Sequence, residues 1–150
     1  MPTISEILEA ARQRGVQKSL SYQGALVPQE AHELQTRAPG TKLVDIRTRA
    51  ELTYVGRIPG AVEIEWQVYP EGRLNPSFLA ELQAQVDKES LVMFICRSGA
   101  RSHHAAEAAT AAGYTQCYNV LEGFQGDRDE NKHRDTVGGW RAAGLPWYQS

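Results

Sequence analysis

The residues best able to do chemistry lie in one short stretch, from Cys96 to Ser102. It follows the apolar run 91–95 and precedes the alanine-rich segment 103–112, an order that predicts a strand, a tight loop and a helix. Main-chain N–H groups and the N-terminus of that helix would face the sulfur of Cys96 and stabilise negative charge there. We therefore expect this cysteine to ionise and to be a nucleophile that acts on an anion or becomes one.

The other residues of this loop are candidates to hold an anion. Arg97 and Arg101 add two permanent cations and are candidate substrate contacts, although one of them could instead brace the loop through a carboxylate. The two serines could hydrogen-bond the sulfur or cap the helix, and Gly99 provides a backbone conformation that other residues resist. The residues predicted to bind substrate are Arg97, Ser98, Gly99, Ala100, Arg101 and Ser102.

The length of the loop separates two kinds of anion chemistry. Counted with Cys96 as the first residue, Arg101 is the sixth, whereas cysteine phosphatases place their phosphate-binding arginine seventh. A seven-residue ring of N–H groups fits a tetrahedral phosphate or arsenate, and a six-residue ring is tighter and suits one extra sulfur. The count favours sulfur transfer over phosphatase or arsenate-reductase chemistry, which remains an open alternative.

The composition narrows the class of protein. With 150 residues, 41% hydrophobic and 23% charged, the chain is expected to form one domain over 1–150 with a sizeable core. A net charge of −2 without a basic block gives nucleic-acid binding no support, and the apolar runs are too short to span a membrane. Two cysteines do not make a disulfide framework, and the N-terminus has no signal-peptide pattern, so we expect a cytoplasmic protein.

The elements that must position the loop are predicted from periodicity and capping. An amphipathic helix is expected over 3–14, where Thr3 and Glu6 fit a capping box and Gly15 would end the helix. Strand and helix then alternate, which indicates an α/β domain with a mainly parallel sheet and a ligand site at the carboxyl ends of its strands, where Cys96 lies. The pattern predicts strands over 43–46, 61–64, 91–95 and 114–120, and helices over 28–37, 49–54, from Asn75 onward, after Cys96 and over 140–143.

Other reactive side chains are assigned supporting or structural roles. Asp45 lies in an apolar run, so it needs hydrogen-bond partners that would orient neighbouring loops, with proton transfer as the alternative role. Arg47 is its expected companion near the pocket. Cys117 is expected to be a buried apolar residue, with a disulfide to the loop cysteine as the alternative. The adjacent His103 and His104 lack the spacing of metal-ligand motifs, so we expect packing or solvent-facing side chains and no metal site.

With these motifs in view, the sequence resembles the rhodanese family of sulfurtransferases. The resemblance implies a rhodanese-like α/β fold over about 27–148, with a mainly parallel five-stranded sheet flanked by helices on both faces. It implies a persulfide on Cys96, loaded from a small anionic donor such as thiosulfate and passed to cyanide or a cellular thiol, with no metal or organic cofactor. It rests on four stretches in the family order: Leu43 to Arg47 followed by Glu51, Gly56 to Ala61, Cys96 to Ser102, and Asn119 to Gly123 with Gly139-Trp140 and Ala143 to Pro146.

Two features depart from the family pattern. Arg57 stands where the family usually has histidine, which changes a turn hydrogen bond or adds charge near the mouth of the site. The polar insertion 125–137 lies where family members are usually shorter, and it is a candidate for partner contact or a lid, or else a solvated loop. A persulfide carrier or sulfide-responsive module, loaded by a partner protein, is therefore the main alternative to an enzyme that uses free thiosulfate.

Overall fold

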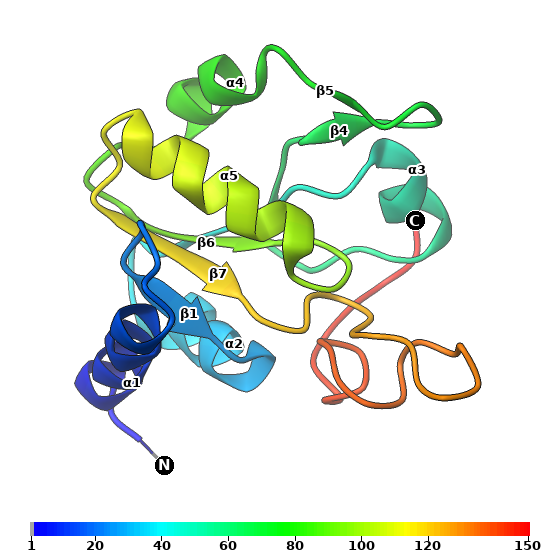
Figure 1. Cartoon of the computed structure of the whole chain (residues 1–150), viewed down its shortest axis with the longest axis horizontal. Helices are drawn as coiled ribbons and strands as arrows, with labels where there is room; N and C mark the ends of the chain where they lie inside the picture. The colour runs from blue at the N-terminus through cyan, green and yellow to red at the C-terminus, as the bar shows by residue number, and fades with distance from the viewer. Residues whose placement is uncertain (1) are drawn as a thin grey trace.

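The central sheet is built from short apolar strands. The computed structural model describes residues 2–150, and its main sheet has five parallel strands in the order β1-β7-β6-β2-β3 (Figure 1). This confirms the expected α/β fold with a mainly parallel five-stranded sheet. The strands are β1 (Gly24–Leu26), β2 (Lys42–Asp45), β3 (Val62–Glu63), β6 (Leu91–Ile95) and β7 (Gln116–Val120).

Helices cover both faces of the sheet, and the central strand β6 shows why its sequence has no polar alternation. Val92 and Phe94 join the core beneath two helices, whereas Met93 and Ile95 join the core on the opposite face. The first pair of helices is α4 (Phe78–Gln85) and α5 (Ala100–Ala111), and the second pair is α1 (Ile4–Gln17) and α2 (Pro28–Arg37). A further short helix, α3 (Arg49–Tyr54), follows β2.

Two small strand elements were not expected from the sequence. The edge strand β1 has three residues, and β4 (Gln67–Val68) pairs with β5 (Arg73–Leu74) as an antiparallel hairpin outside the main sheet. Strands of two or three residues are too short to show a period of two, so hydrophobic patterning does not find them. The hairpin matters for function because it stands beside the active-site loop.

Several predicted helix ends were wrong. α1 continues through Gly15 to Gln17, because a Cβ at residue 15 would lie only 2.8 Å from the carbonyl oxygen of Gln23, so this glycine permits close packing instead of ending the helix. α4 begins at Phe78, and the Oδ1 of Asn75 accepts the N–H of Ser77 at 3.0 Å just before it. Residues 140–143 form hydrogen-bonded turns, not a helix.

The insertion 125–137 is folded by its own hydrogen bonds. The Oδ1 of Asp129 accepts the main-chain N–H groups of Asn131 and His133, and the guanidinium of Arg134 donates to the carbonyl of Gly126 at 2.7 Å. The hydrogen bonds to Asp129, led by the one from the main chain of His133 and then the one from the hydroxyl of Thr136, lower the pKa of its carboxyl. Within the residues described, no helix is both long and apolar enough to cross a membrane.

Candidate active site

The loop after β6 folds round the sulfur of Cys96. The cysteine comes directly after the strand, and α5 begins at Ala100, three residues earlier than the alanine-rich segment alone predicted. The main-chain N–H groups of Gly99 and Ser102 point at the sulfur over 3.2 and 3.4 Å. Gly99 has φ +106°, a conformation in which a side chain would be strained, so the expected role of this glycine is confirmed. The arrangement stabilises a thiolate or a persulfide anion.

Ser102 and Asn119 form a buried polar pair next to the sulfur of Cys96. The hydroxyl of Ser102 lies 3.3 Å from the sulfur and donates to the Oδ1 of Asn119 on β7. The Nδ2 of Asn119 in turn donates to the carbonyl of Gly99 at 3.1 Å. Sequence reasoning placed Asn119 only in a motif and gave it no role at the site. Its signal was a polar residue in an otherwise apolar strand, where a buried amide needs partners.

The turn after β7 holds the loop in place from outside. The N–H of Phe124 donates to the carbonyl of Cys96 at 2.8 Å, and the N–H of Gln125 donates to that of Arg97 at 3.0 Å. Gly123 permits this approach, because a Cβ there would lie 2.5 Å from the carbonyl carbon of Arg97. The insertion 125–137 therefore starts from a segment bonded directly to the active-site loop.

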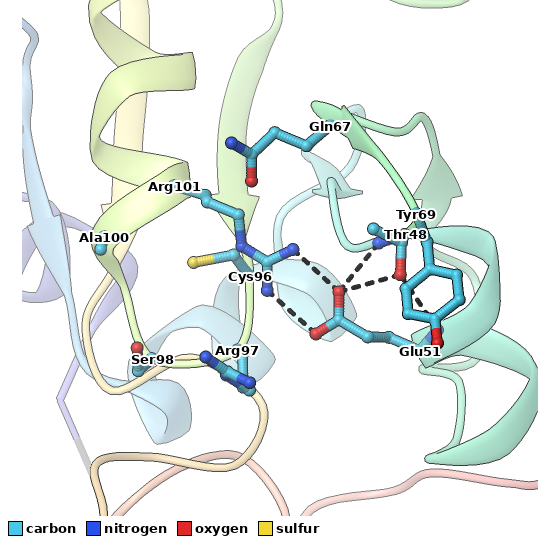
Figure 2. A pocket seen from close by; sticks show the side chains of 9 residues that line it. All are labelled: Thr48, Glu51, Gln67, Tyr69, Cys96, Arg97, Ser98, Ala100 and Arg101. Atoms are coloured by element: carbon cyan, nitrogen blue, oxygen red, sulfur yellow. Dashed lines mark hydrogen bonds and ion pairs between the residues drawn. The ribbon is translucent and has the colours of Figure 1, made fainter. Parts of the chain in front are cut away.

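Arg101 is bound to a carboxylate. Its two terminal nitrogens donate to both oxygens of Glu51 on α3, at 2.8 and 2.9 Å (Figure 2). Burial alone would raise the pKa of Glu51, but the hydrogen bonds and charge of Arg101, helped by bonds from Thr48, lower it to about 2. Burial likewise opposes the charge of Arg101, and its bonds to Glu51 outweigh that effect, so its pKa is raised. Arg101 is therefore the loop arginine that braces the loop through a carboxylate, the alternative to substrate contact that we gave for one of the two arginines.

A cavity of ≈ 480 Å³ opens over the sulfur. Arg97 lies at its edge with an exposed side chain, and no ion pair joins it to a carboxylate within residues 2–150 (Figure 2). Gln67 and Tyr69 enter from the β4–β5 hairpin, and neither was predicted because the hairpin itself was not. The residues that line the cavity are Thr48, Glu51, Gln67, Tyr69, Cys96, Arg97, Ser98, Ala100 and Arg101.

Asp45 and Arg47 lie behind the loop and do not line this cavity. Both side chains are fully buried, and the guanidinium of Arg47 makes paired hydrogen bonds to the carboxylate of Asp45, the shortest of them 2.7 Å. Arg47 also donates to the carbonyl of Gly56 at 2.8 Å and stacks 4.0 Å above the ring of Phe124. The pair thus ties β2 to two loops, in agreement with the structural role expected for Asp45, and Arg47 is its companion, although it is Thr48, the next residue, that lines the cavity.

The unusual Arg57 has a structural partner. Its side chain pairs with Glu63 at 2.6 Å, and its main chain bridges to Tyr148. It does not line the cavity over Cys96. The substitution therefore changes contacts of a turn and leaves the charge at the mouth of the site as it is.

Cys117 is too far from Cys96 for a disulfide. In the parallel register of β6 and β7 it lies opposite Val92, four residues before Cys96 along β6. Four residues of strand extend about 13 Å, whereas the Cα atoms of a disulfide are about 4.4–6.8 Å apart. Both cysteines are free, and burial raises the pKa of the Cys117 thiol to about 11. The role of a buried apolar residue therefore holds, and the disulfide alternative does not.

Comparison with known proteins identifies the family. Residues 27–130 match the rhodanese-like domain. The crystal structure of Rv0390 from M. tuberculosis is 44% identical, covers 87% of this chain and 100% of its own, and superposes with a TM-score of 0.79. A Rickettsia conorii protein, RC0915, is 32% identical over 120 residues, which are 79% of this chain and 91% of that protein.

A protein named as a sulfurtransferase, from Allochromatium vinosum, is 33% identical over 82 residues, which are 55% of this chain and 66% of that protein. The match over 27–130 covers four of the five strands of the main sheet and the loop around Cys96, so the described site lies inside the matched region. The chain belongs to the rhodanese-like domain family, a family of the sulfurtransferase type.

Proposed function

We propose that this protein is a sulfurtransferase that carries sulfane sulfur as a persulfide on Cys96. The single observation that supports this most is the six-residue loop, whose N–H groups at Gly99 and Ser102 converge on one sulfur. The sulfurtransferase name of the Allochromatium vinosum relative agrees with this reading. The donor would be thiosulfate or a similar small anion, and the acceptor would be cyanide or a cellular thiol.

The chemistry needs two displacements at sulfur. The thiolate of Cys96 attacks the outer sulfur of thiosulfate, a new S–S bond forms, and the old S–S bond breaks as sulfite leaves with its electron pair. The persulfide anion that results is stabilised by the N–H groups of the loop. An attacking cyanide then takes the outer sulfur as thiocyanate, or a thiol takes it as a new persulfide, and the Cys96 thiolate is restored.

The charges of the site suit a small anionic donor. Because Glu51 neutralises Arg101, the guanidinium of Arg97 is the free cation of the loop and would meet the sulfonate end of thiosulfate. Arg101 would instead hold α3 and the loop together, so that the cavity keeps its shape. In this proposal Arg97 binds the donor and Arg101 supports the loop.

A carrier that is loaded by a partner protein is the second candidate. A second cavity opens beside the first and shares Ser98 with it, and its other lining residues come from the insertion: Asp127, Arg128, Asp129, Glu130, Lys132 and Arg134. A partner that delivers sulfur to Cys96 would meet this insertion first. Slow turnover with free thiosulfate and fast loading from a desulfurase would favour the carrier.

The decisive experiment is intact-mass analysis after incubation with thiosulfate. The protein should gain one sulfur atom, about 32 Da, and cyanide should remove it with release of thiocyanate. The Cys96→Ser variant should gain nothing, and Cys117→Ser, the matched control, should gain the same mass as the parent. No gain in the parent, or a gain that survives in Cys96→Ser, would refute the proposal. Hydrolysis of an aryl phosphate that depends on Cys96 would instead support the phosphatase alternative.

A further inference from the structure

Two histidines and a glutamate meet on the first turns of α5, outside the site described above. His103, His104 and Glu107 are all partly exposed, and one ligand atom from each lies within 4.8 Å of the others. The Nε2 of His103 lies 3.6 Å from one carboxylate oxygen of Glu107, and the Nδ1 of His104 lies 3.2 Å from the other. The carboxylate therefore lies between the two imidazoles.

These distances match the spacing of ligands round a metal ion. Zinc binds imidazole nitrogen and carboxylate oxygen at about 2.0–2.2 Å, so neighbouring ligand atoms of a tetrahedral ion are about 3.3 Å apart. Both nitrogen-to-carboxylate distances are already close to this value. Because the two nitrogens lie against different oxygens of Glu107, the carboxylate would bind the ion through both oxygens or rotate, and the ligand atoms, now within 4.8 Å of one another, would draw closer.

The imidazole of His103 is also oriented by a second residue. Its Nδ1 lies 2.6 Å from the hydroxyl of Tyr22, on the side of the ring away from Glu107. In the tautomer that carries its proton on Nδ1, the imidazole of His103 donates to the hydroxyl of Tyr22. That tautomer would leave the Nε2 of His103 free of its proton and able to bind an ion beside the carboxylate of Glu107. Metal-binding histidines commonly have such a partner on their other nitrogen.

A cavity next to the cluster gives room for further ligands. It measures ≈ 380 Å³, and its lining includes Lys18, Tyr22, both histidines and Asn119. The cavity also touches Gly99 and Ala100, so it meets the active-site loop on another side from the cavity over Cys96.

We propose that His103, His104 and Glu107 bind one divalent transition-metal ion, with Zn²⁺ as the best fit, and leave a coordination position open to water. Two imidazoles and one carboxylate are ligands that zinc accepts in sites with an open position. The site departs from our expectation of no metal, which rested on spacing along the chain: the ligands follow at i, i+1 and i+4, and the helix brings them together. The proposal is independent of the sulfur chemistry.

Zn²⁺ titration followed by calorimetry tests the site. The full chain should carry Cys96→Ser, so that a reactive thiol does not compete for the metal, and it should bind one Zn²⁺ per chain. Glu107→Gln and His104→Ala should each weaken binding by about tenfold or more, and Tyr22→Phe should weaken it by about tenfold through the lost partner of His103. The matched controls His133→Ala and Glu89→Gln change exposed residues elsewhere and should bind as the parent does.

A second readout reports the ligands directly. Co²⁺ bound at the site should give a ligand-field absorption spectrum of low coordination number, and this spectrum should disappear in Glu107→Gln. Because the three ligands are partly exposed, the variants should keep the circular dichroism of the parent. Absence of Zn²⁺ binding, or binding that Glu107→Gln and His104→Ala leave unchanged, would overturn the proposal.

Discussion

The two cysteines of this chain belong to neighbouring strands, one inside its strand and one just beyond it, and both are buried and free. Cys117 lies inside β7, in the core beneath the alanines of α5, and burial raises its pKa to about 11. Cys96 lies one residue beyond β6, where two main-chain N–H groups and the hydroxyl of Ser102 surround the sulfur. Burial by itself therefore does not decide whether a thiol is reactive. Directed N–H groups at the end of a strand make the difference.

The largest expected effect comes from exchanging each sulfur for oxygen. Cys96→Ser should lower thiocyanate formation from thiosulfate and cyanide by about a thousandfold or more, because the nucleophile is lost. Cys117→Ser should keep activity and lose about 1–2 kcal/mol of unfolding free energy, since a hydroxyl replaces a buried thiol. Steady-state assays and urea unfolding of both variants measure the contrast. Equal activities in Cys96→Ser and Cys117→Ser would show that the two thiols do not differ in their role in sulfur transfer.

Alkylation tests the same contrast without mutation. At pH 8 a thiol whose pKa is about 11 is ionised in only about one molecule in a thousand, and Cys117 is also closed off from reagent. Iodoacetamide should therefore label Cys96 at least about a hundredfold faster, as peptide mass mapping over time would show. Preloading with thiosulfate should move the label to the outer sulfur of the persulfide, so that the labelled peptide is about 32 Da heavier, and unfolding in urea should expose Cys117. Fast labelling of Cys117 in the folded protein would contradict the structure.

The contrast also shows what the sequence can foretell. Cys96, its glycine and the parallel sheet were predictable, because they depend on local patterns: an apolar strand, a turn residue and an alanine-rich helix. The residues that complete the site were not predictable, because they are distant from Cys96 in the sequence. Asn119 reaches the loop from the neighbouring strand β7, Glu51 reaches it from α3, and Gln67 reaches it from a hairpin too short to leave a pattern. The sequence left open which arginine would be the brace, and only the position of Glu51 decides it.

The pair of Glu51 and Arg101 is expected to give a medium effect on stability. Since the pKa of Glu51 falls from 4.5 to about 2 on folding, the unfolded chain binds a proton first as the pH drops. The stabilisation is therefore complete above pH 4.5 and is lost as the pH falls toward 2. Glu51→Gln should cost about 2–3 kcal/mol at pH 7, because Arg101 is left partly buried and unpaired.

Urea unfolding at several pH values checks this expectation. The difference between parent and Glu51→Gln should shrink between pH 4.5 and pH 2, as the parent loses the charge that the variant never had. Glu63→Gln is a useful control, since it breaks the ion pair of Arg57 away from the cavity. A difference that stays constant over this pH range would show that Glu51 does not act through its charge.

The smallest expected effect concerns Asn119, which lies two residues beyond Cys117 on the same strand and so on the same face of the sheet. β7 thus contributes the buried thiol of Cys117 to the core. It also contributes the amide of Asn119, which holds Ser102 and Gly99 in the cradle of Cys96, that is, in the set of groups that surround its sulfur. Asn119→Ala removes both bonds and should lower kcat by about tenfold, with little change in KM, because the cradle loosens while the cavity and Arg97 are untouched. Asn119→Asp keeps the acceptor for Ser102 but loses the donor to Gly99, so its kcat should lie between those of Asn119→Ala and the parent. If the two variants have equal kcat values, the hydroxyl of Ser102 does not depend on Asn119, and the N–H groups alone distinguish Cys96 from Cys117.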